Sequence, residues 1–258
     1  MSSRSAGPAP RAAVHLELAR ALGNLALAPL QLADYAMRRA SLRLELAALL
    51  ESPAALDAEP APRPPTRSLR VFVSCAEHSG QIHAVNVVRE LKRSLAAQRA
   101  PQTALSGLGG PPLAAEGVAL LGNPVERAMM GFDGVLQALP WYLGLLERCA
   151  AHFRDARPDV AILVDSPALH VPLGRIARRY GVKVLHFVTP QHWGWAPWRT
   201  SGYARSVDRA LTILPFEREW FRRRGVAVAH VGHPLQDRLA GVPRASHPPE
   251  SLCLALLP

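Results

Sequence analysis

The segment Arg157-Pro158-Asp159-Val160-Ala161-Ile162-Leu163-Val164-Asp165-Ser166-Pro167 decides the fold class that we expect for this chain. Its five consecutive apolar residues, 160–164, predict a strand that is buried on both sides. Continuous apolar strands are typical of parallel sheets that are covered by helices on both faces. The polar turn after the strand then lies at its carboxyl end, where open α/β sheets bind their ligands.

Strands and helices alternate on both sides of this segment. Further strands are expected at 69–74, 103–108, 119–121, 182–188, 209–213 and 228–231. Helices are expected at 80–97, 112–116, 136–156, 173–180, 198–206 and 217–224. This alternation predicts an α/β fold with a doubly wound, Rossmann-like parallel sheet over residues 68–240.

Three segments with other compositions precede the sheet. Residues 1–12 are rich in Ser, Pro, Ala and Arg, which predicts a disordered tail. The leucine-rich residues 13–51 predict a helical extension that Pro29 kinks or splits. It is either a basic amphipathic segment on a membrane or a helical hairpin docked on its own domain or a partner. Residues 52–67 contain five prolines and predict a linker.

The composition limits the possible classes of protein. Of the 258 residues, 49% are hydrophobic and 19% are charged, so the chain is not disordered overall. The net charge of +10 favours a phosphate ligand, an anionic lipid surface or nucleic acid, unless it reflects only an arginine-rich proteome. Cys75, Cys149 and Cys253 lie too far apart for a zinc motif or a disulfide framework. Residues 19–33 are too short and interrupted to span a membrane.

Polar turns follow the first two expected strands. Glu77, Ser79 and Gly80 open a helix, where free N–H groups could bind an anion or a sugar hydroxyl, although Ser79 could be a simple N-cap. Gly109 and Gly110 belong to a three-glycine turn, 107–111, that either lets the backbone approach a ligand or is a plain tight turn.

Asp165 directly follows the buried strand at 160–164. A carboxylate held at such a strand end by a rigid turn is suited to act as a general base, and apolar neighbours would raise its pKa. The alternative is that Asp165 caps the next helix.

Two later loops carry further candidates. His192, Trp193 and Trp195 stand together in the loop 188–195, which is either an aromatic platform for a sugar or acyl chain or a structural cap over the sheet. His233 follows the last expected strand, near the ligand cleft, unless it is a structural histidine.

Together and in this order, seven segments resemble the lipid A disaccharide synthase family of inverting glycosyltransferases. They span 69–237 and consist of 76–81, 109–111, 130–131, 157–160, 187–195, 214–217 and 231–234. The first 67 residues lie outside the resemblance.

The resemblance implies the GT-B architecture of two Rossmann-like halves, of which this chain would supply the amino-terminal, acceptor-side half. The family joins UDP-2,3-diacylglucosamine to 2,3-diacylglucosamine 1-phosphate (lipid X) and releases UDP, with no cofactor or metal. Asp165 would be the general base, and the substrate would contact Glu77, Ser79, Gly80, Gly109, Gly110, His192, Trp193, Trp195 and His233. The protein would lie on the cytoplasmic side of the inner membrane of a Gram-negative bacterium. Nucleic acid is not an expected partner, because the basic residues are scattered.

Three residues depart from the family pattern. Gln81 and Ala168 each replace an acidic residue, and His170 replaces an asparagine. Each change is expected to remove a polar contact, which could alter the acceptor or abolish turnover. The alternative function is therefore a non-catalytic module that binds a lipid or sugar phosphate. A UDP-sugar epimerase is a weaker alternative, because the loop with Trp193 and Trp195 argues against it.

Residues 241–258 predict a linker and then the first strand of a second domain, at 252–258. In the resembling family that domain binds most of the UDP-sugar. We therefore expect this chain alone to be inactive, as a fragment, a truncated product or one half of a split enzyme that needs a separate carboxyl-terminal half.

Overall fold

The computed structural model describes residues 7–51, 64–127 and 135–241. In chain order the elements are α1 (Pro10–Leu50), β1 (Arg70–Cys75), α2 (His78–Ala97), β2 (Ala104–Leu108), α3 (Pro111–Ala115), β3 (Ala119–Gly122), α4 (Pro124–Arg127), α5 (Val135–Asp155), β4 (Val160–Val164), α6 (Pro167–Arg179), β5 (Lys183–Phe187), α7 (His192–Trp195), the 3-10 helix η2 (Pro197–Arg199), α8 (Thr200–Ala204), β6 (Arg209–Thr212), α9 (Pro215–Arg222), β7 (Val228–His230) and α10 (Pro234–Leu239). Segments 130–131 and 252–258, which carried sequence expectations, lie outside the described residues.

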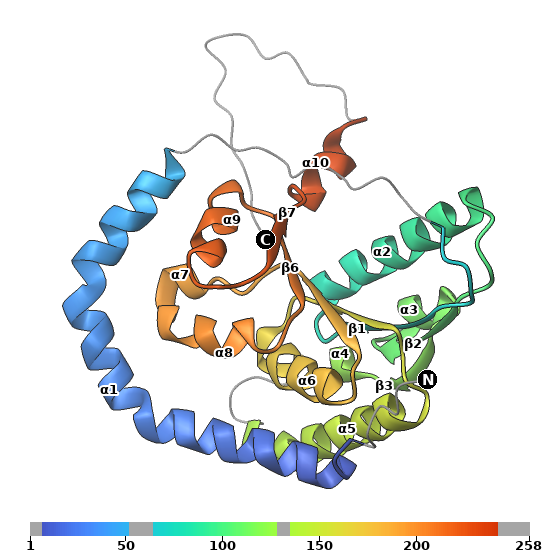
Figure 1. Ribbon diagram of the computed structural model, residues 1–258, viewed down its shortest axis with the longest axis horizontal. Helices are drawn as coiled ribbons and strands as arrows, with labels where there is room; N and C mark the ends of the chain where they lie inside the picture. Colours follow the sequence, from blue (N-terminus) through green and yellow to red (C-terminus); the bar gives the residue numbers. More distant parts are fainter. Residues whose placement is uncertain (1–6, 52–63, 128–134, 242–258) are drawn as a thin grey trace.

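The strands form one parallel sheet in the order β3-β2-β1-β4-β5-β6-β7 (Figure 1). This order confirms the predicted doubly wound, Rossmann-like α/β fold. The chain moves outward from β1 to β3 and then returns to pair β4 with the other side of β1. The carboxyl ends of β1 and β4 therefore lie at the topological switch point, where ligands bind in this class of sheet.

Alternating side chains of β1 supply the two cores of the sheet. Val71 and Val73 face a cluster with Ala84 and Val88 of α2, and all four are buried. Phe72 faces the opposite cluster, where its ring meets that of Phe153 from α5 at a centroid distance of 4.9 Å. Because both faces are covered, the strands can be apolar throughout, as the sequence of β4 indicated.

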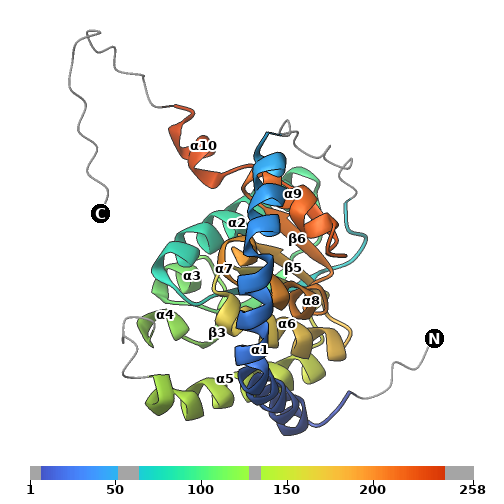
Figure 2. The same ribbon diagram turned by 90° about the vertical axis from the view of Figure 1, so that its left-hand side faces the viewer.

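The leucine-rich extension is one helix of 41 residues that continues through Pro29. It is neither split at this proline nor folded into a hairpin, so those two expectations were wrong. Instead α1 curves along the outside of the domain, from α5 at one end to α9 at the other (Figures 1 and 2). A curved path is consistent with a proline that removes one backbone hydrogen bond inside a helix.

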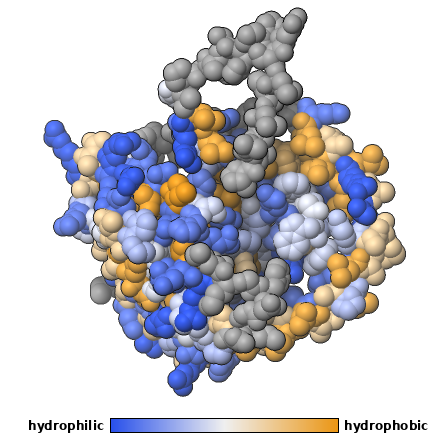
Figure 3. Space-filling model, turned by 180° about the vertical axis from the view of Figure 1, so that it is seen from behind, coloured by the Kyte–Doolittle hydropathy of each residue, from blue (hydrophilic) through white to orange (hydrophobic). Residues whose placement is uncertain are grey.

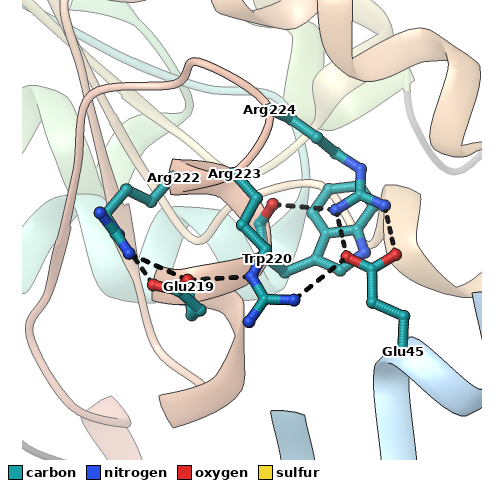
Figure 4. A network of polar contacts seen from close by, with 6 residues as sticks. All are labelled: Glu45, Glu219, Trp220, Arg222, Arg223 and Arg224. Atoms are coloured by element: carbon teal, nitrogen blue, oxygen red, sulfur yellow. Dashed lines mark hydrogen bonds and ion pairs between the residues drawn. The ribbon is translucent and has the colours of Figure 1, made fainter. Parts of the chain in front are cut away.

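Ion pairs hold α1 at both of its ends. Near the start, Glu17 is 4% exposed, and its carboxylate accepts hydrogen bonds from Arg175 at 2.6 Å and Arg179 at 3.2 Å. Near the other end, Glu45 accepts two hydrogen bonds from Arg224, at 3.0 and 2.8 Å (Figure 4). The Arg224 guanidinium also lies 4.0 Å above the ring of Trp220. These contacts dock the extension on its own domain.

The middle of α1 has little cover. The large apolar side chains exposed here are those of Leu22, Leu25, Leu27, Leu30, Leu32, Met37 and Leu44. No helix in the described ranges is long and apolar enough to cross a membrane. Seen from behind, the molecule has hydrophobic side chains in separate groups among hydrophilic ones (Figure 3).

Four short elements and one early helix start were not expected from the sequence. These short elements are α4, α7, η2 and α10. Helix α6 begins at Pro167, although Pro172 lies inside it, whereas the sequence indicated a start at 173. The earlier start matters for the site, because it places the first turn of α6 directly after Asp165.

Candidate active site

The backbone of Asp165 and Ser166 is left-handed, with φ of 57° and 45°. Such angles cost an ordinary residue about 1–2 kcal/mol, so the surroundings must hold them. The Asp165 N–H donates to the carbonyl of Phe187 at 2.8 Å. The Asp165 carbonyl accepts hydrogen bonds from His170 Nδ1 at 2.5 Å and from His186 Nε2 at 2.9 Å. The main chain of Asp165 is therefore fixed on both sides.

The two histidines are buried and neutral. Burial lowers the pKa of His170 to about 3 and also lowers the pKa of His186. A carbonyl can only accept, so each ring must carry its proton on the nitrogen that faces Asp165. The other nitrogens can then accept from the hydroxyls of Ser74, at 2.8 Å, and Tyr203, at 2.9 Å. We call His170 and His186 the histidine clamp.

The turn between β1 and α2 lies against Asp165. A side-chain carbon added at Gly80 would be 3.4 Å from the carbonyl oxygen of Val164 and 3.7 Å from Cβ of Asp165. The hydroxyl of Ser166 donates to the Glu77 carboxylate at 3.2 Å. The structure thus brings Glu77 and Gly80 together with Asp165.

Neither Asp165 nor Ser79 is a helix cap. The N-cap of α2 is Glu77 and that of α6 is Ser166. Ser79 lies inside the first turn of α2 and is exposed. Neither side chain therefore serves as the helix N-cap that the sequence left open as an alternative.

His83 adds a group to the site that the sequence analysis missed. Burial lowers the pKa of its half-buried ring, and Asp165 acts in the opposite direction while His233 and Arg238 lower it further. His83 therefore lies within electrostatic reach of both Asp165 and His233. The sequence could have indicated His83, because it lies four residues after Ser79 and therefore on the same face of a helix.

The side chain of Gln81 is hydrogen-bonded to the glycine turn 107–111. The Gln81 side-chain oxygen accepts from the Gly110 N–H at 2.6 Å, and both residues are buried. A side-chain carbon at Gly109 would lie 2.8 Å from the Leu113 side chain, and one at Gly107 would collide with Val73. These glycines allow close packing within the chain, as a plain tight turn does.

Two of the three residues that depart from the family pattern make polar contacts within this chain. Gln81 supplies an acceptor to Gly110. His170 contacts both Ser74 and Asp165. Ala168, in contrast, is exposed and has no polar side-chain atom to offer.

The tryptophans of the loop 188–195 differ in their surroundings. Trp193 donates through Nε1 to the buried Glu217 at 3.0 Å and packs edge-on against Phe216, which fits a structural cap. Trp195 is 52% exposed, with the guanidinium of Arg199 5.0 Å from its ring centroid.

His192 and His233 have different environments. His192 is buried, which lowers its pKa to about 4, and within the described residues its Nδ1 has no hydrogen-bond partner. His233 accepts a hydrogen bond from the Leu235 N–H at 3.2 Å and so caps α10.

A pocket of about 850 Å³ opens beside the turn that carries Glu77 and Ser79. One wall belongs to α5, another to the first turns of α6, including Ser166 and Ala168, and a third to α1. Sequence reasoning missed this pocket, because α1 and α5 lie far apart in the chain.

The comparisons with known proteins identify similar sequences. A family model described as "Lipid-A-disaccharide synthetase" matches residues 71–255. The lipid-A-disaccharide synthase of Geobacter sulfurreducens is 37% identical over 176 residues, which cover 67% of this chain and 44% of that protein. The enzyme of Myxococcus xanthus is also 37% identical, over 174 residues that cover 67% and 44%. That of Chromohalobacter salexigens is 39% identical over 175 residues, covering 66% and 43%.

The chain therefore spans less than half the length of these relatives. Among solved structures, Glycyrrhiza uralensis UGT73P12, complexed with glycyrrhetinic acid 3-O-monoglucuronide, aligns with a TM-score of 0.44 and 10% identity over 66% of this chain and 49% of that one. A likeness this weak says nothing about the site.

Proposed function

This chain belongs to the lipid-A-disaccharide synthetase family, and from that premise we propose that it forms the acceptor-side half of a lipid-A-disaccharide synthase. The proposed reaction joins UDP-2,3-diacylglucosamine to lipid X and releases UDP. The observation that carries the proposal is Asp165, which the histidine clamp fixes at the switch point of the sheet beside Glu77 and Gly80. A carboxylate held there is suited to general-base catalysis.

In this proposal, Asp165 takes the proton from the attacking hydroxyl of lipid X. The hydroxyl oxygen bonds to the anomeric carbon of the donor sugar, and the bond from that carbon to UDP breaks with inversion. Glu77, Ser79 and Gly80 bind the acceptor sugar next to Asp165.

The remaining candidates lie farther along the sheet edge. We assign His192, Trp195 and His233 to substrate contacts, since they follow the neighbouring strands. Trp193, Gly109 and Gly110 act through the backbone segments that they hold in place.

The donor site is proposed to lie in the part of the relatives that this chain does not match. The matched part is about 44% of the length of the Geobacter sulfurreducens protein. A second Rossmann-like half, on the same polypeptide or a separate one, would bind UDP-2,3-diacylglucosamine and close over the acceptor.

We place the protein on the cytoplasmic surface of the inner membrane, where its lipid substrates reside. The exposed leucines of α1 and the net charge of +10 support a peripheral position on an anionic bilayer.

The test measures disaccharide and UDP formation by the 258-residue chain mixed with a separately expressed carboxyl-terminal half of the Geobacter sulfurreducens relative. Asp165→Asn is expected to reduce the rate about 10²–10⁴-fold, because the amide cannot accept the proton. Asp155→Asn, an exposed carboxylate that pairs with Arg154, serves as the matched control and should retain full activity.

Full activity of Asp165→Asn would refute the general-base role. Disaccharide formation by the 258-residue chain alone would refute the assignment of the donor site to the unmatched part.

A second candidate function is a non-catalytic module that binds a lipid or sugar phosphate. The exposed Ala168 at the pocket favours it, because the resembling family carries an acidic residue there. Lipid X binding without transfer, even after the second half is added, would establish this alternative. Restoration of transfer would exclude it.

A further inference from the structure

The pocket beside Glu77 is closed on one side by a helix that lies outside the family match. Val14, Leu18 and Ala21 of α1 line it, whereas the family model begins at residue 71. A neighbouring wall belongs to α5 and includes Leu139, Leu143 and Leu146. This wall of α1 is therefore specific to chains that carry such an extension.

The wall is held firmly against the domain. Val14 and Ala13 are each 1% exposed and belong to the same core cluster as Leu146 and Leu169. One turn later, Glu17 is bound by Arg175 and Arg179. Ala21 follows one turn after Glu17, so the lining side chains recur at the spacing that places them on one face of a helix.

The pocket lining combines polar and apolar side chains. Its polar residues come mainly from the sheet edge and include Glu77, Ser79 and Ser166. Those from α1 and α5 are mostly Leu, Val and Ala. The volume of about 850 Å³ lies within the range of about 300–1,000 Å³ that is typical of small-molecule sites. Its occupant must combine a polar head at the sheet edge with a long apolar part.

We propose that α1 completes a site for one acyl chain of the acceptor lipid, with the polar head of the lipid at Glu77, Ser79 and Ser166 and the chain along α1 and α5. Burial of the chain removes both its own surface and the apolar lining from water, which drives binding. The inference rests on the proposed function for the identity of the lipid. The pocket itself can be tested with a simple fatty acid.

The experiment uses the 258-residue chain and a fatty acid of about fourteen carbons that carries a photoactivatable diazirine near its methyl end. After irradiation, mass spectrometry should locate the label on residues 11–21 of α1 and 138–146 of α5. Unlabelled fatty acid should compete for this site. A label confined to the exposed segment 22–44 of α1 would overturn the proposal.

Two matched substitutions test the wall of α1. Ala21→Trp fills the pocket and should weaken binding of the fluorescent fatty acid cis-parinaric acid roughly tenfold or more. Ala19 is exposed like Ala21 but is not part of the pocket lining, so Ala19→Trp introduces the same side chain outside the pocket and should leave binding unchanged. Equal affinity of the two variants would refute the proposal.

The outcomes separate this inference from the proposed function. Weakened probe binding in Ala21→Trp, with no transfer by the complemented wild-type chain, would support the pocket and refute the synthase function. Loss of transfer in Asp165→Asn, with neither probe affinity nor the KM for lipid X changed in Ala21→Trp, would support the function and refute the pocket.

Discussion

At the scale of single residues, the position of Asp165 depends on groups that do not touch the substrate in the proposed reaction. The histidine clamp, the carbonyl of Phe187 and the hydroxyls of Ser74 and Tyr203 together hold its left-handed backbone. Each clamp ring must stay neutral, because its second nitrogen accepts a hydrogen bond. The geometry of the base is thus linked to the protonation of two buried rings.

The clamp predicts that acid destabilises the fold. The pKa of His170 is lowered by burial from 6.5 to about 3, so the unfolded chain binds a proton that the folded chain does not. The stability contributed by the neutral ring is therefore complete above pH 6.5 and is lost as the pH falls toward 3. The slope for each such proton is about 1.4 kcal/mol per pH unit. Urea unfolding at a series of pH values from 7 to 5 measures this slope.

His170→Phe provides the comparison for this measurement. The variant should show a smaller slope and a lower stability at pH 7, by about 1–3 kcal/mol, because the Asp165 carbonyl and the Ser74 hydroxyl each lose a buried partner. His15→Phe changes an exposed histidine on α1 and should leave the slope unchanged. An identical slope in His170→Phe and the wild type would contradict the assignment.

At the scale of elements, the two ends of α1 are anchored with different strength. Glu17→Ala should lower the free energy of unfolding by about 3 kcal/mol, because it leaves Arg175 and Arg179 without their buried partner. Glu45→Ala should cost only about 0.5–1 kcal/mol, since Glu45 and Arg224 are partly exposed. Urea unfolding measures both costs, and hydrogen exchange of the α1 amides shows which end loosens. A larger cost for Glu45→Ala would refute this ranking.

The main elements of the sheet could be predicted from the sequence because local patterns determine them. The strand at 160–164 has the predicted bounds, since an apolar run between polar turns leaves little choice. The sequence placed the start of α6 at 173, whereas the helix begins at Pro167. Here the first turn after Ser166 packs Leu169 into the core and offsets the cost of the internal proline.

The candidate site was predicted in part. Glu77, Gly80 and Asp165 could be grouped because the carboxyl ends of adjacent parallel strands must meet. The clamp and the pocket could not be predicted, because both arise from contacts between distant segments. No local pattern indicates that His170 and His186 meet one carbonyl or that α1 faces α5.

At the scale of the whole molecule, the net charge of +10 predicts salt-dependent membrane binding. Association with vesicles that contain about one third anionic lipid should weaken strongly between about 0.05 and 0.5 M NaCl, because salt screens charges over a distance of about 10 Å or less at and above 0.1 M. Co-sedimentation measures the bound fraction, with vesicles of neutral lipid as the control. Binding that does not change with salt would show that the exposed leucines act without the charge.

The two anchors of α1 also make it a bivalent ligand of its own domain. A helix of 41 residues is roughly 60 Å long and stiff, so docking of one end presents the other end at a high effective concentration. An anchor that would bind its site only weakly as a separate peptide is then bound most of the time. Release of the helix requires both anchors to open at once, whereas a single opening is local and quickly reversed. Opening of a single anchor therefore leaves the extension attached to the domain.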